Sequence, residues 1–395
     1  MQSNDQPYLS VLIPVYNRKD ALARCLEVLS QQTLAHDQFE VIVIDDGSTD
    51  QPEILQNHFD CQLNLRFIRQ GHKNRAAALN NGISHARGEV IVFTDSDMVP
   101  TPSLLERHYV FHHKHPYPNW AMLGHIDWHP ALTITPFMQY IVSNDGWQFA
   151  YHLLNDGDPV NGFYFYGGNS SIKRQFLLDH GLLNEVFFQC EDIELGYRLS
   201  QAGLVIIYDA LAVSYHWHVV TLRDFSQRNR DVGRANVLFA YHHPEQSINL
   251  NLFSAPSVAI KLERRGQNLE DWIVRAELLE QQNSLAPDKT QLHQLYYLIL
   301  LASLGQGICD ALQTDFEHTN ILCSVIVPLS HPPELLSDAV KVQMAMPQGQ
   351  GYEFLLLDAA SSLPASNSLG FQHLFRITPG PSWICMMAAA RARGK

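Results

Sequence analysis

Residues 89–97 read Glu-Val-Ile-Val-Phe-Thr-Asp-Ser-Asp, and this stretch decides the fold class of the chain. Its four apolar residues, mostly β-branched, predict a buried strand that ends near Phe93. Two carboxylates, Asp95 and Asp97, follow at once. In an open α/β sheet, ligands bind at the carboxyl ends of the strands. Such a pair suits a hard divalent cation, or one cation and one sugar hydroxyl, although plain strand-to-loop turns carry the same pattern.

Strand and helix patterns alternate along the chain. Short apolar runs predict strands, and apolar residues at helical spacing predict the helices between them. This alternation predicts an α/β fold with a largely parallel sheet and right-handed crossovers. Strands are expected at 10–15, 39–44, 65–68, 90–93, 205–208 and 211–215, and helices at 22–29, 79–86, 192–202 and 224–241. Residues 100–161 show no clean period, and residues 263–312 are mainly helical, with breaks at Ala286-Pro-Asp and at Gly305.

Composition narrows the function classes. The 395-residue chain is 46% hydrophobic and 17% charged, which is typical of a folded protein, and its formal charge of −13 argues against a nucleic-acid partner. The six cysteines are scattered, as in a reducing compartment. The N-terminus has no signal-peptide pattern, and the apolar run 295–302 is too short to cross a bilayer. We therefore expect a cytoplasmic protein, and peripheral contact with the inner face of a membrane stays open.

Three segments near the C-terminus repeat three N-terminal segments in the same order, which indicates an internal duplication. The second copy stops before its own Asp-x-Asp, and Ala359 and Ser330 stand where the first copy has Asp46 and Tyr16. We therefore expect a first domain at 1–244, a mainly helical linker at 245–320 and a truncated second module at 321–395, in a fragment of a longer two-module enzyme. The repeats pair 324–328 with 10–14, 352–358 with 39–45, and 392–395 with 86–89.

Polar residues also follow the first two predicted strands. Tyr16 and Asn17 come after the first strand, and Asp45 and Asp46 after the second. Carboxylates at strand ends can accept hydrogen bonds from a base N–H and from ribose hydroxyls, so these residues predict a nucleoside pocket. Taken alone, Asp46-Gly-Ser48 favours a plain turn.

A second acidic group precedes the helix predicted at 192–202. Glu191 and Asp192 follow the loop Gly167-Gly-Asn169 along the chain. Asp192 stands where a helix N-cap would stand, so capping is one interpretation. In the other interpretation, Asp192 is a general base and the 167–169 loop shapes a sugar pocket.

Histidines follow the last predicted strand of this region in Tyr215-His-Trp-His218. On a strand, His216 and His218 would point to one side and Trp217 to the other, so either could close over the site. By contrast, we interpret His112, His113 and His115 as a solvated helix end.

Taken in order, these motifs resemble family 2 of the nucleotide-sugar glycosyltransferases over roughly 8–244. The resemblance rests on the strand with Asp-Asp-Gly-Ser48, the strand with Asp95-Ser-Asp97, Glu191-Asp-x-Glu-Leu-Gly-Tyr-Arg-Leu199 and the late histidine. The resemblance implies the GT-A fold, a Rossmann-like domain with helices on both faces of the sheet. One departure is Gly181-Leu-Leu-Asn-Glu185, where the family usually has Gly-Phe-Asp-Glu.

The resemblance also implies a role for each matching residue. Asp46 would read uracil or thymine, Asp95 would contact the ribose, and Asp97 would hold Mn²⁺ or Mg²⁺. Asp192 would be the base, and His216 or His218 would bind the metal or the diphosphate. The full expected set is catalytic Glu191 and Asp192; donor-binding Pro14, Tyr16, Asn17, Asp46, Asn80, Asp95 and Ser96; acceptor-binding Gly167, Gly168 and Asn169; and metal-binding Asp97, His216 and His218.

The resulting hypothesis is an inverting hexosyl- or N-acetylhexosaminyl-transferase that uses a nucleotide diphosphate sugar, with UDP favoured, and a glycan or lipid-linked acceptor, in polysaccharide biosynthesis. Inversion needs one base and one stabiliser of the leaving group, not two flanking carboxylates. A sugar-nucleotide nucleotidyltransferase would need a glycine-rich basic loop, which Pro14-Val-Tyr-Asn17 is not. A degenerate nucleotide-sugar-binding module without turnover is the non-enzymatic alternative.

Overall fold

The computed structural model divides the chain into two compact units, Met1–Val220 and Thr221–Lys395. The boundary falls earlier than the predicted residue 244, because helix α8 (Leu222–His242) packs against helix α11 (Lys289–Glu317) of the second unit. The residues that the structure describes are 6–143, 146–246, 250, 252, 255–256, 258–259, 262, 266–282, 289–317, 324–328 and 353–357.

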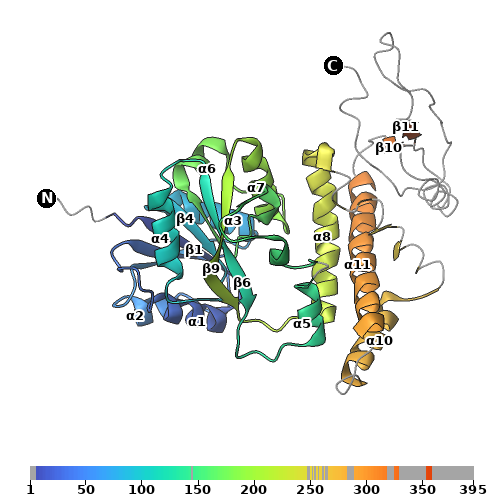
Figure 1. Cartoon of the computed structure of the whole chain (residues 1–395), viewed down its shortest axis with the longest axis horizontal. Coiled ribbons are helices and arrows are strands. Elements are labelled where there is room, and N and C mark those ends of the chain that lie inside the picture. The colour runs from blue at the N-terminus through green and yellow to red at the C-terminus, as the bar shows by residue number, and fades with distance from the viewer. Residues whose placement is uncertain are drawn as a thin grey trace, which may run out of the picture. The chain divides into compact units, whose positions relative to one another are not determined.

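The first unit is built on one sheet of nine described strands, ordered β3-β2-β1-β4-β8-β6-β9-β5 with β7 beside β9 (Figure 1). Strands β3, β2, β1 and β4 are parallel, as the alternating pattern predicted. Their carboxyl ends therefore meet at one edge of the sheet. The strands are β1 (Leu9–Val15), β2 (Phe39–Asp45), β3 (Leu65–Arg69), β4 (Val90–Thr94), β5 (Met98–Pro100), β6 (Trp120–Trp128), β7 (Pro159–Val160), β8 (Asn169–Lys173) and β9 (Val205–His216).

Helices cover both faces of this sheet, which confirms the predicted fold class. Successive side chains of a strand point to opposite faces. Leu12 of β1 accordingly joins a core with α3, α6 and α7, whereas Val11 joins a core with α1, α2 and α4. The helices of this unit are α1 (Lys19–Leu29), α2 (Ile54–Phe59), α3 (Arg75–His85), α4 (Leu104–Lys114), α5 (Pro136–Ile141), α6 (Arg174–His180) and α7 (Glu191–Gln201), with short 3₁₀ turns η1 (Tyr151–Leu153) and η2 (Gly162–Tyr164).

The other half of the sheet is mixed. Strand β8 runs antiparallel to both β4 and β6, and β9 runs parallel to β6. The strands predicted at 205–208 and 211–215 are two parts of the single strand β9. Between them the pairing with β6 jumps from Asp209 to Val213, which is a bulge in a continuous strand. Strand β5 then pairs antiparallel with the end of β9, Met98 opposite His216. This pairing brings the Asp-x-Asp segment next to the late histidine.

In the second unit, α8 and α11 approach closely where both carry glycine. A Cβ built on Gly233 would lie 2.2 Å from the Leu304 carbonyl oxygen, and one on Gly307 would lie 1.8 Å from that of Arg230. Asp310 of α11 accepts from Arg230 at 2.6 Å and from Arg234 at 2.9 Å. Gly305 does not break the helix, contrary to prediction.

Helix α11 also contains Thr290–Leu312, which is long and apolar enough to cross a membrane by length and composition. The run 295–302 is therefore part of a longer apolar helix than the sequence pattern indicated. Its mean hydropathy is 1.5, but 67% of the window is buried, as in the core helix of a folded unit. A further described helix of this unit is α10 (Leu269–Gln282), and η3 (Pro244–Gln246) is a 3₁₀ turn. The expected break at Ala286-Pro-Asp lies outside the described residues.

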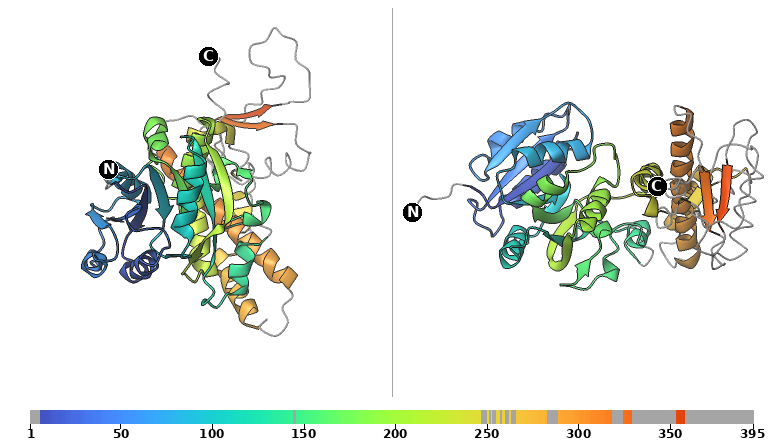
Figure 2. Two further views of the ribbon diagram at one scale, coloured as in Figure 1. Left: turned by 60° about the vertical axis from the view of Figure 1, so that its left-hand side comes forward. Right: turned by 90° about the horizontal axis from the view of Figure 1, so that it is seen from above.

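Strands β10 (Ser324–Pro328) and β11 (Glu353–Leu357) pair in parallel (Figure 2). Their register sets Ser324 opposite Glu353, and in the first unit Ser10 lies opposite Glu40. The repeat seen in the sequence therefore extends to backbone pairing. Ala359, Ser330 and the rest of the expected second module lie outside the described residues.

Candidate active site

Carboxylates gather at the edge where the parallel strands end. Asp46 follows β2, Asp95 and Asp97 follow β4, and β1 lies between these strands. Helix α7 begins with Glu191 and Asp192, and a single guanidinium, that of Arg75, joins Asp95 to Glu191. The structure thus brings together acidic residues that are far apart in the sequence.

Asp46 is buried, at 4% exposed, and lies against the segment after β3. Its carboxylate accepts from the Lys73 amide at 3.0 and 3.2 Å and from Gln70 Nε2 at 2.7 Å. His72 Nδ1 lies 2.9 Å from Asp46 Oδ2, and the Tyr16 ring stacks on His72 at 4.0 Å and 17°. Asp46 is therefore more than a turn residue, because its carboxylate organises a surface that carries two exposed rings.

The turn after β2 is closed by the neighbouring residue, Asp45, and not by Asp46. Asp45 Oδ1 accepts from the Ser48 amide at 2.8 Å, and its Oδ2 pairs with Arg69 at 2.8 Å. Asn17 takes a left-handed conformation, with φ of 53°, and its Oδ1 accepts from the Thr49 amide at 2.7 Å. Both residues shape the loops beside Asp46.

Three other predicted donor residues have different surroundings. Pro14 is partly buried within β1, and Ser96 is buried between the two aspartates. Asn80 exchanges hydrogen bonds with the backbone of Leu183, at 2.9 and 3.0 Å, and donates to Glu185 Oε1 at 3.0 Å. Its amide thus ties α3 to the segment before α7 and does not face the strand ends, because both of its polar atoms are engaged there.

Asp97 lies between a guanidinium and an imidazole. Arg18 Nη1 is 2.5 Å from Asp97 Oδ2, and His216 Nε2 is 3.8 Å from the same oxygen. His218 follows the end of β9, is exposed, and has its ring centre 5.8 Å from that of His216. Of the two histidines, His216 is therefore the one placed beside Asp97.

This pair bears on the expected metal. Mg²⁺ and similar cations commonly take one or two protein ligands, with the rest from substrate phosphates and water. An aspartate oxygen and an imidazole nitrogen fit that role for Mn²⁺ or Mg²⁺, provided that Arg18 moves aside. Among the described residues no group of three or more His, Cys, Asp and Glu could hold a metal by itself.

Asp192 is not a helix cap. Cys190 occupies the N-cap of α7 in a left-handed conformation, with φ of 63°, so Asp192 is the second helical residue. Its Oδ2 accepts from the Gly167 amide at 2.8 Å and its Oδ1 from the Ile193 amide at 2.8 Å. The capping interpretation is wrong, and Asp192 instead contacts the 167–169 loop through the Gly167 amide.

Asn169 belongs to the interior and not to an acceptor surface. It is 1% exposed, and its Nδ2 donates to the carbonyls of His125 and Ala212 at 3.0 and 2.8 Å. Its Oδ1 lies 3.1 Å from Nε2 of His108. The prediction for Asn169 is wrong because its amide joins β6, β8 and β9 beneath the bulge.

The solvated helix end predicted around residue 112 is also wrong in part. His112 is fully buried, with Nε2 2.8 Å from Ser171 Oγ, and only His113 is exposed. His115 stacks on Trp120 at 4.5 Å and 15°. Histidines of α4 therefore contribute to the core.

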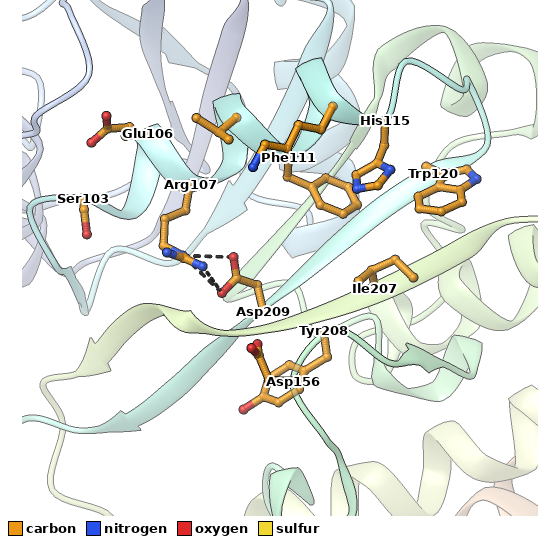
Figure 3. A pocket seen from close by; sticks show the side chains of 13 residues that line it. Ser103, Glu106, Arg107, Phe111, His115, Trp120, Asp156, Ile207, Tyr208 and Asp209 are labelled. Carbon is orange, nitrogen blue, oxygen red and sulfur yellow. Dashed lines mark hydrogen bonds and ion pairs between the residues drawn. The ribbon is translucent and has the colours of Figure 1, made fainter.

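A cavity of about 650 Å³ lies elsewhere, between α4 and β9 (Figure 3). Arg107 and Asp209 form an ion pair at 2.7 Å in its middle, and Trp120 lies at one end. Asp209 also accepts from the Leu211 amide at 2.9 Å, so this pair stabilises the β9 bulge. None of the predicted site residues lines the cavity, and we place the candidate active site at the carboxylate cluster.

The sequence pattern missed the basic partners of these carboxylates. Arg75 opens α3 and contacts Asp95 and Glu191, Arg18 contacts Asp97, and His72 contacts Asp46. One signal was available, because Arg75 is followed by Ala-Ala-Ala-Leu and is the only charged side chain in the first turns of that helix.

Comparisons with known proteins give a consistent family. Residues 10–180 match the model described as Glycosyl transferase family 2. The chain is similar to the uncharacterized glycosyltransferase YfnE of Bacillus subtilis (strain 168), at 29% identity over 254 residues, which cover 52% of this chain and 64% of that protein. It is also similar to chondroitin synthase of Escherichia coli, at 29% identity over 241 residues, which cover 53% of this chain and 34% of that protein.

A solved structure agrees at the level of the fold. Mannosyltransferase PcManGT from Pyrobaculum calidifontis, in complex with GDP-Man and Mn²⁺, matches with a TM-score of 0.50 and 16% identity, over 76% of this chain and 87% of that one. The chain spans only about a third to two thirds of the length of the two curated relatives, so its own activity is a separate question. Residues 10–180 thus carry a domain that matches glycosyl transferase family 2, and the architecture around it is the GT-A fold.

Proposed function

We propose that the first unit is an inverting glycosyltransferase that moves a sugar from a nucleoside diphosphate sugar to a hydroxyl acceptor, with Asp192 as the general base. The carrying observation is the shared guanidinium of Arg75, which joins Asp95 at a strand end to Glu191, the neighbour of Asp192. A donor side and a base-bearing helix are thus two halves of one site. At the family level, the match of residues 10–180 to glycosyl transferase family 2 supports the same assignment.

For the donor we favour a uridine nucleotide. Asp46 offers carboxylate oxygens, which accept hydrogen bonds, and the N3–H of uracil is a donor of the matching kind. Tyr16 is 45% exposed beside it and could lie against a base. The related mannosyltransferase structure holds GDP-Man and Mn²⁺, so the same fold accommodates another nucleotide sugar and a cation.

In the transfer step, the acceptor hydroxyl attacks the anomeric carbon on the face opposite the leaving diphosphate. Asp192 takes the hydroxyl proton while the new oxygen–carbon bond forms and the bond from the anomeric carbon to the phosphate oxygen breaks. The Gly167 and Ile193 amides hold both carboxylate oxygens of Asp192 in place. Asp97 and His216 would hold Mn²⁺ or Mg²⁺, which when bound supplies Lewis-acid stabilisation of the diphosphate.

For the acceptor we propose a glycan or a lipid-linked glycan in polysaccharide biosynthesis, on the cytoplasmic side of a membrane. Similarity to a chondroitin synthase supports a polysaccharide, although the matched part covers only 34% of that protein. The screen of nucleotide sugars described next also tests whether the transferred sugar is a hexose or an N-acetylhexosamine.

The test is a screen of UDP-, dTDP- and GDP-sugars for nucleotide release, with Mn²⁺, Mg²⁺ or EDTA, and with Asp37→Asn as an exposed-carboxylate control. We expect release from a UDP-sugar in the presence of metal, and a β-linked product from an α-linked donor by NMR. Retention of the anomeric configuration, or folded protein that releases nucleotide from none of the donors, would refute the proposal.

A further inference from the structure

Arg75 uses its guanidinium on three partners at once. Nε and Nη2 donate to Asp95 Oδ1 at 2.9 and 2.8 Å, and Nη1 donates to Glu191 Oε1 at 2.6 Å. Nη2 also donates to the carbonyl oxygen of Gly167 at 2.9 Å. Arg75 is the first residue of α3, whose N-cap Asn74 accepts from the Ala77 amide, so its backbone is fixed by a capped helix. Its side chain therefore reaches both halves of the site from a rigid element.

Gly167 connects Arg75 to Asp192, the proposed general base. Its carbonyl oxygen accepts from Arg75, and its own amide donates to Asp192 Oδ2 at 2.8 Å. Glu191, the other partner, is the residue before Asp192 in α7. Arg75 thus restrains Asp192 along two routes, one through the 167 peptide and one through the first turn of the helix.

The cluster is acidic and largely buried, which makes the counter-charge necessary. Glu191 is 5% exposed, and burial raises its pKa, while Arg75 opposes that rise. Asp95 and Asp192 also face the guanidinium. The further neighbours are Asp97, which faces Asp95, and Tyr166, whose hydroxyl faces Asp192. Without Arg75, three carboxylates would adjoin one another with no cation between them.

We propose that Arg75 is a positioning residue: it holds the Asp192 carboxylate in its reactive place through Gly167 and Glu191, and couples it to Asp95 on the donor side. The expected effect on kcat rests on the proposed function. The restraint of Asp192 by Arg75 does not depend on that function.

Two substitutions test the proposal from opposite directions. Arg75→Lys keeps the charge but lacks the planar fork that contacts Asp95, Glu191 and Gly167 together. Gly167→Ala keeps the arginine, but the added Cβ would lie 2.6 Å from its Nη2, 2.9 Å from its Nη1 and 3.1 Å from Asp192 Oδ2, so the guanidinium must shift and the carboxylate is crowded less severely. Arg66→Lys is the matched control, because Arg66 pairs with Glu40 at 2.8 Å and belongs to no part of the site.

The first measurement does not depend on turnover. Hydrogen–deuterium exchange by mass spectrometry reports on the Gly167 and Ile193 amides, which both donate to Asp192. We expect both test variants to exchange at least about fivefold faster there, as loss of one ordinary hydrogen bond implies. Unchanged exchange in both variants would overturn the proposal, and Arg66→Lys should match the wild type.

The second measurement is the split between kcat and KM for the best donor found in the screen. Displacing a reacting group by about 1 Å costs about a hundredfold in rate, so kcat should fall by about that factor, with the donor KM within about threefold of the wild type. A raised KM at constant kcat would make Arg75 a donor ligand and overturn the positioning role. If the wild type transfers no sugar, the proposed function fails, and the exchange measurement still decides whether Arg75 positions Asp192.

Discussion

Acidification should destabilise the first unit through His108, which lies at the centre of a buried polar chain. Asn169 Nδ2 donates to two carbonyls, so its Oδ1 must face His108, and His108 Nε2 must carry the proton. His108 Nδ1 lies 2.7 Å from Ser171 Oγ, which in turn lies 2.8 Å from His112 Nε2. A neutral His108 fits this network by accepting from the Ser171 hydroxyl at Nδ1.

The size of this loss of stability follows from the shift in the pKa of His108. Burial lowers the pKa of His108 from 6.5 to about 4; the bond to Asn169 and the charge of Asp209 oppose this, and Arg107 adds to it. Between these two values the unfolded chain binds a proton that the folded chain does not, so stability falls as the pH falls. The full difference of about 2.5 pKa units is worth about 3 kcal/mol, of which about 2 kcal/mol is lost between pH 7 and pH 5.

The assay is urea unfolding at a series of pH values, for the wild type and for His108→Gln. Glutamine keeps a donor near the Nε2 position but does not titrate, so subtracting the two curves cancels the titrating groups that His108 does not influence. We expect the difference in the free energy of unfolding between the wild type and His108→Gln to fall by about 2 kcal/mol from pH 7 to pH 5. His113→Gln, at an exposed position on the same helix, is the control for replacing a histidine with glutamine. Parallel curves for wild type and His108→Gln would refute the reasoning.

The remaining predictions concern the site and the second unit. Asp192→Asn should lower kcat at least about a hundredfold and leave donor affinity nearly intact, and the reverse pattern would make Asp192 a donor ligand. Asp97→Ala should abolish turnover, as should excess chelator on the wild type; full turnover in chelator would contradict the metal role. Gly307→Val should destabilise the second unit by several kcal/mol, because its Cβ would lie 1.8 Å from the Arg230 carbonyl oxygen, and an unchanged melting temperature would contradict that packing. A chain that ends at Glu317 should keep donor hydrolysis and UDP affinity, and a large loss of either would show that the partial repeat completes the first site.

The parallel half of the sheet could be predicted because its strands are buried on both faces. Strands β1, β2 and β4 are continuous apolar runs, and turn residues follow them at once. Residues 100–161 could not be predicted in this way, because β6 mixes polar with apolar positions and the described elements between β6 and residue 161 are short. Strand β9 was read as two strands because its bulge at 209–213 interrupts the alternation, although the backbone continues.

The carboxylates of the site could be predicted because each follows a recognisable strand or precedes a recognisable helix. Their partners could not, because these contacts join residues far apart in sequence: Arg75 and Glu191 are 116 positions apart, and Arg18 and Asp97 are 79 apart. Local pattern also misassigned Asn169, since an asparagine after two glycines looks like a loop residue until the surrounding strands are placed. Tertiary contacts, not local propensity, decide such cases.

The charges of the described site are the reason to expect a cation together with the proposed donor. Four carboxylates, those of Asp95, Asp97, Glu191 and Asp192, share two guanidinium groups, those of Arg75 and Arg18, so four minus two leaves an excess of two negative charges. A diphosphate brought to this cluster would be repelled unless a divalent cation came with it. Arg75 is held by three partners, whereas Arg18 is half exposed and touches Asp97 alone among the site carboxylates. Arg18 is therefore the group that can yield its place beside Asp97, and the dependence on metal expected for the wild type follows from this imbalance of charge.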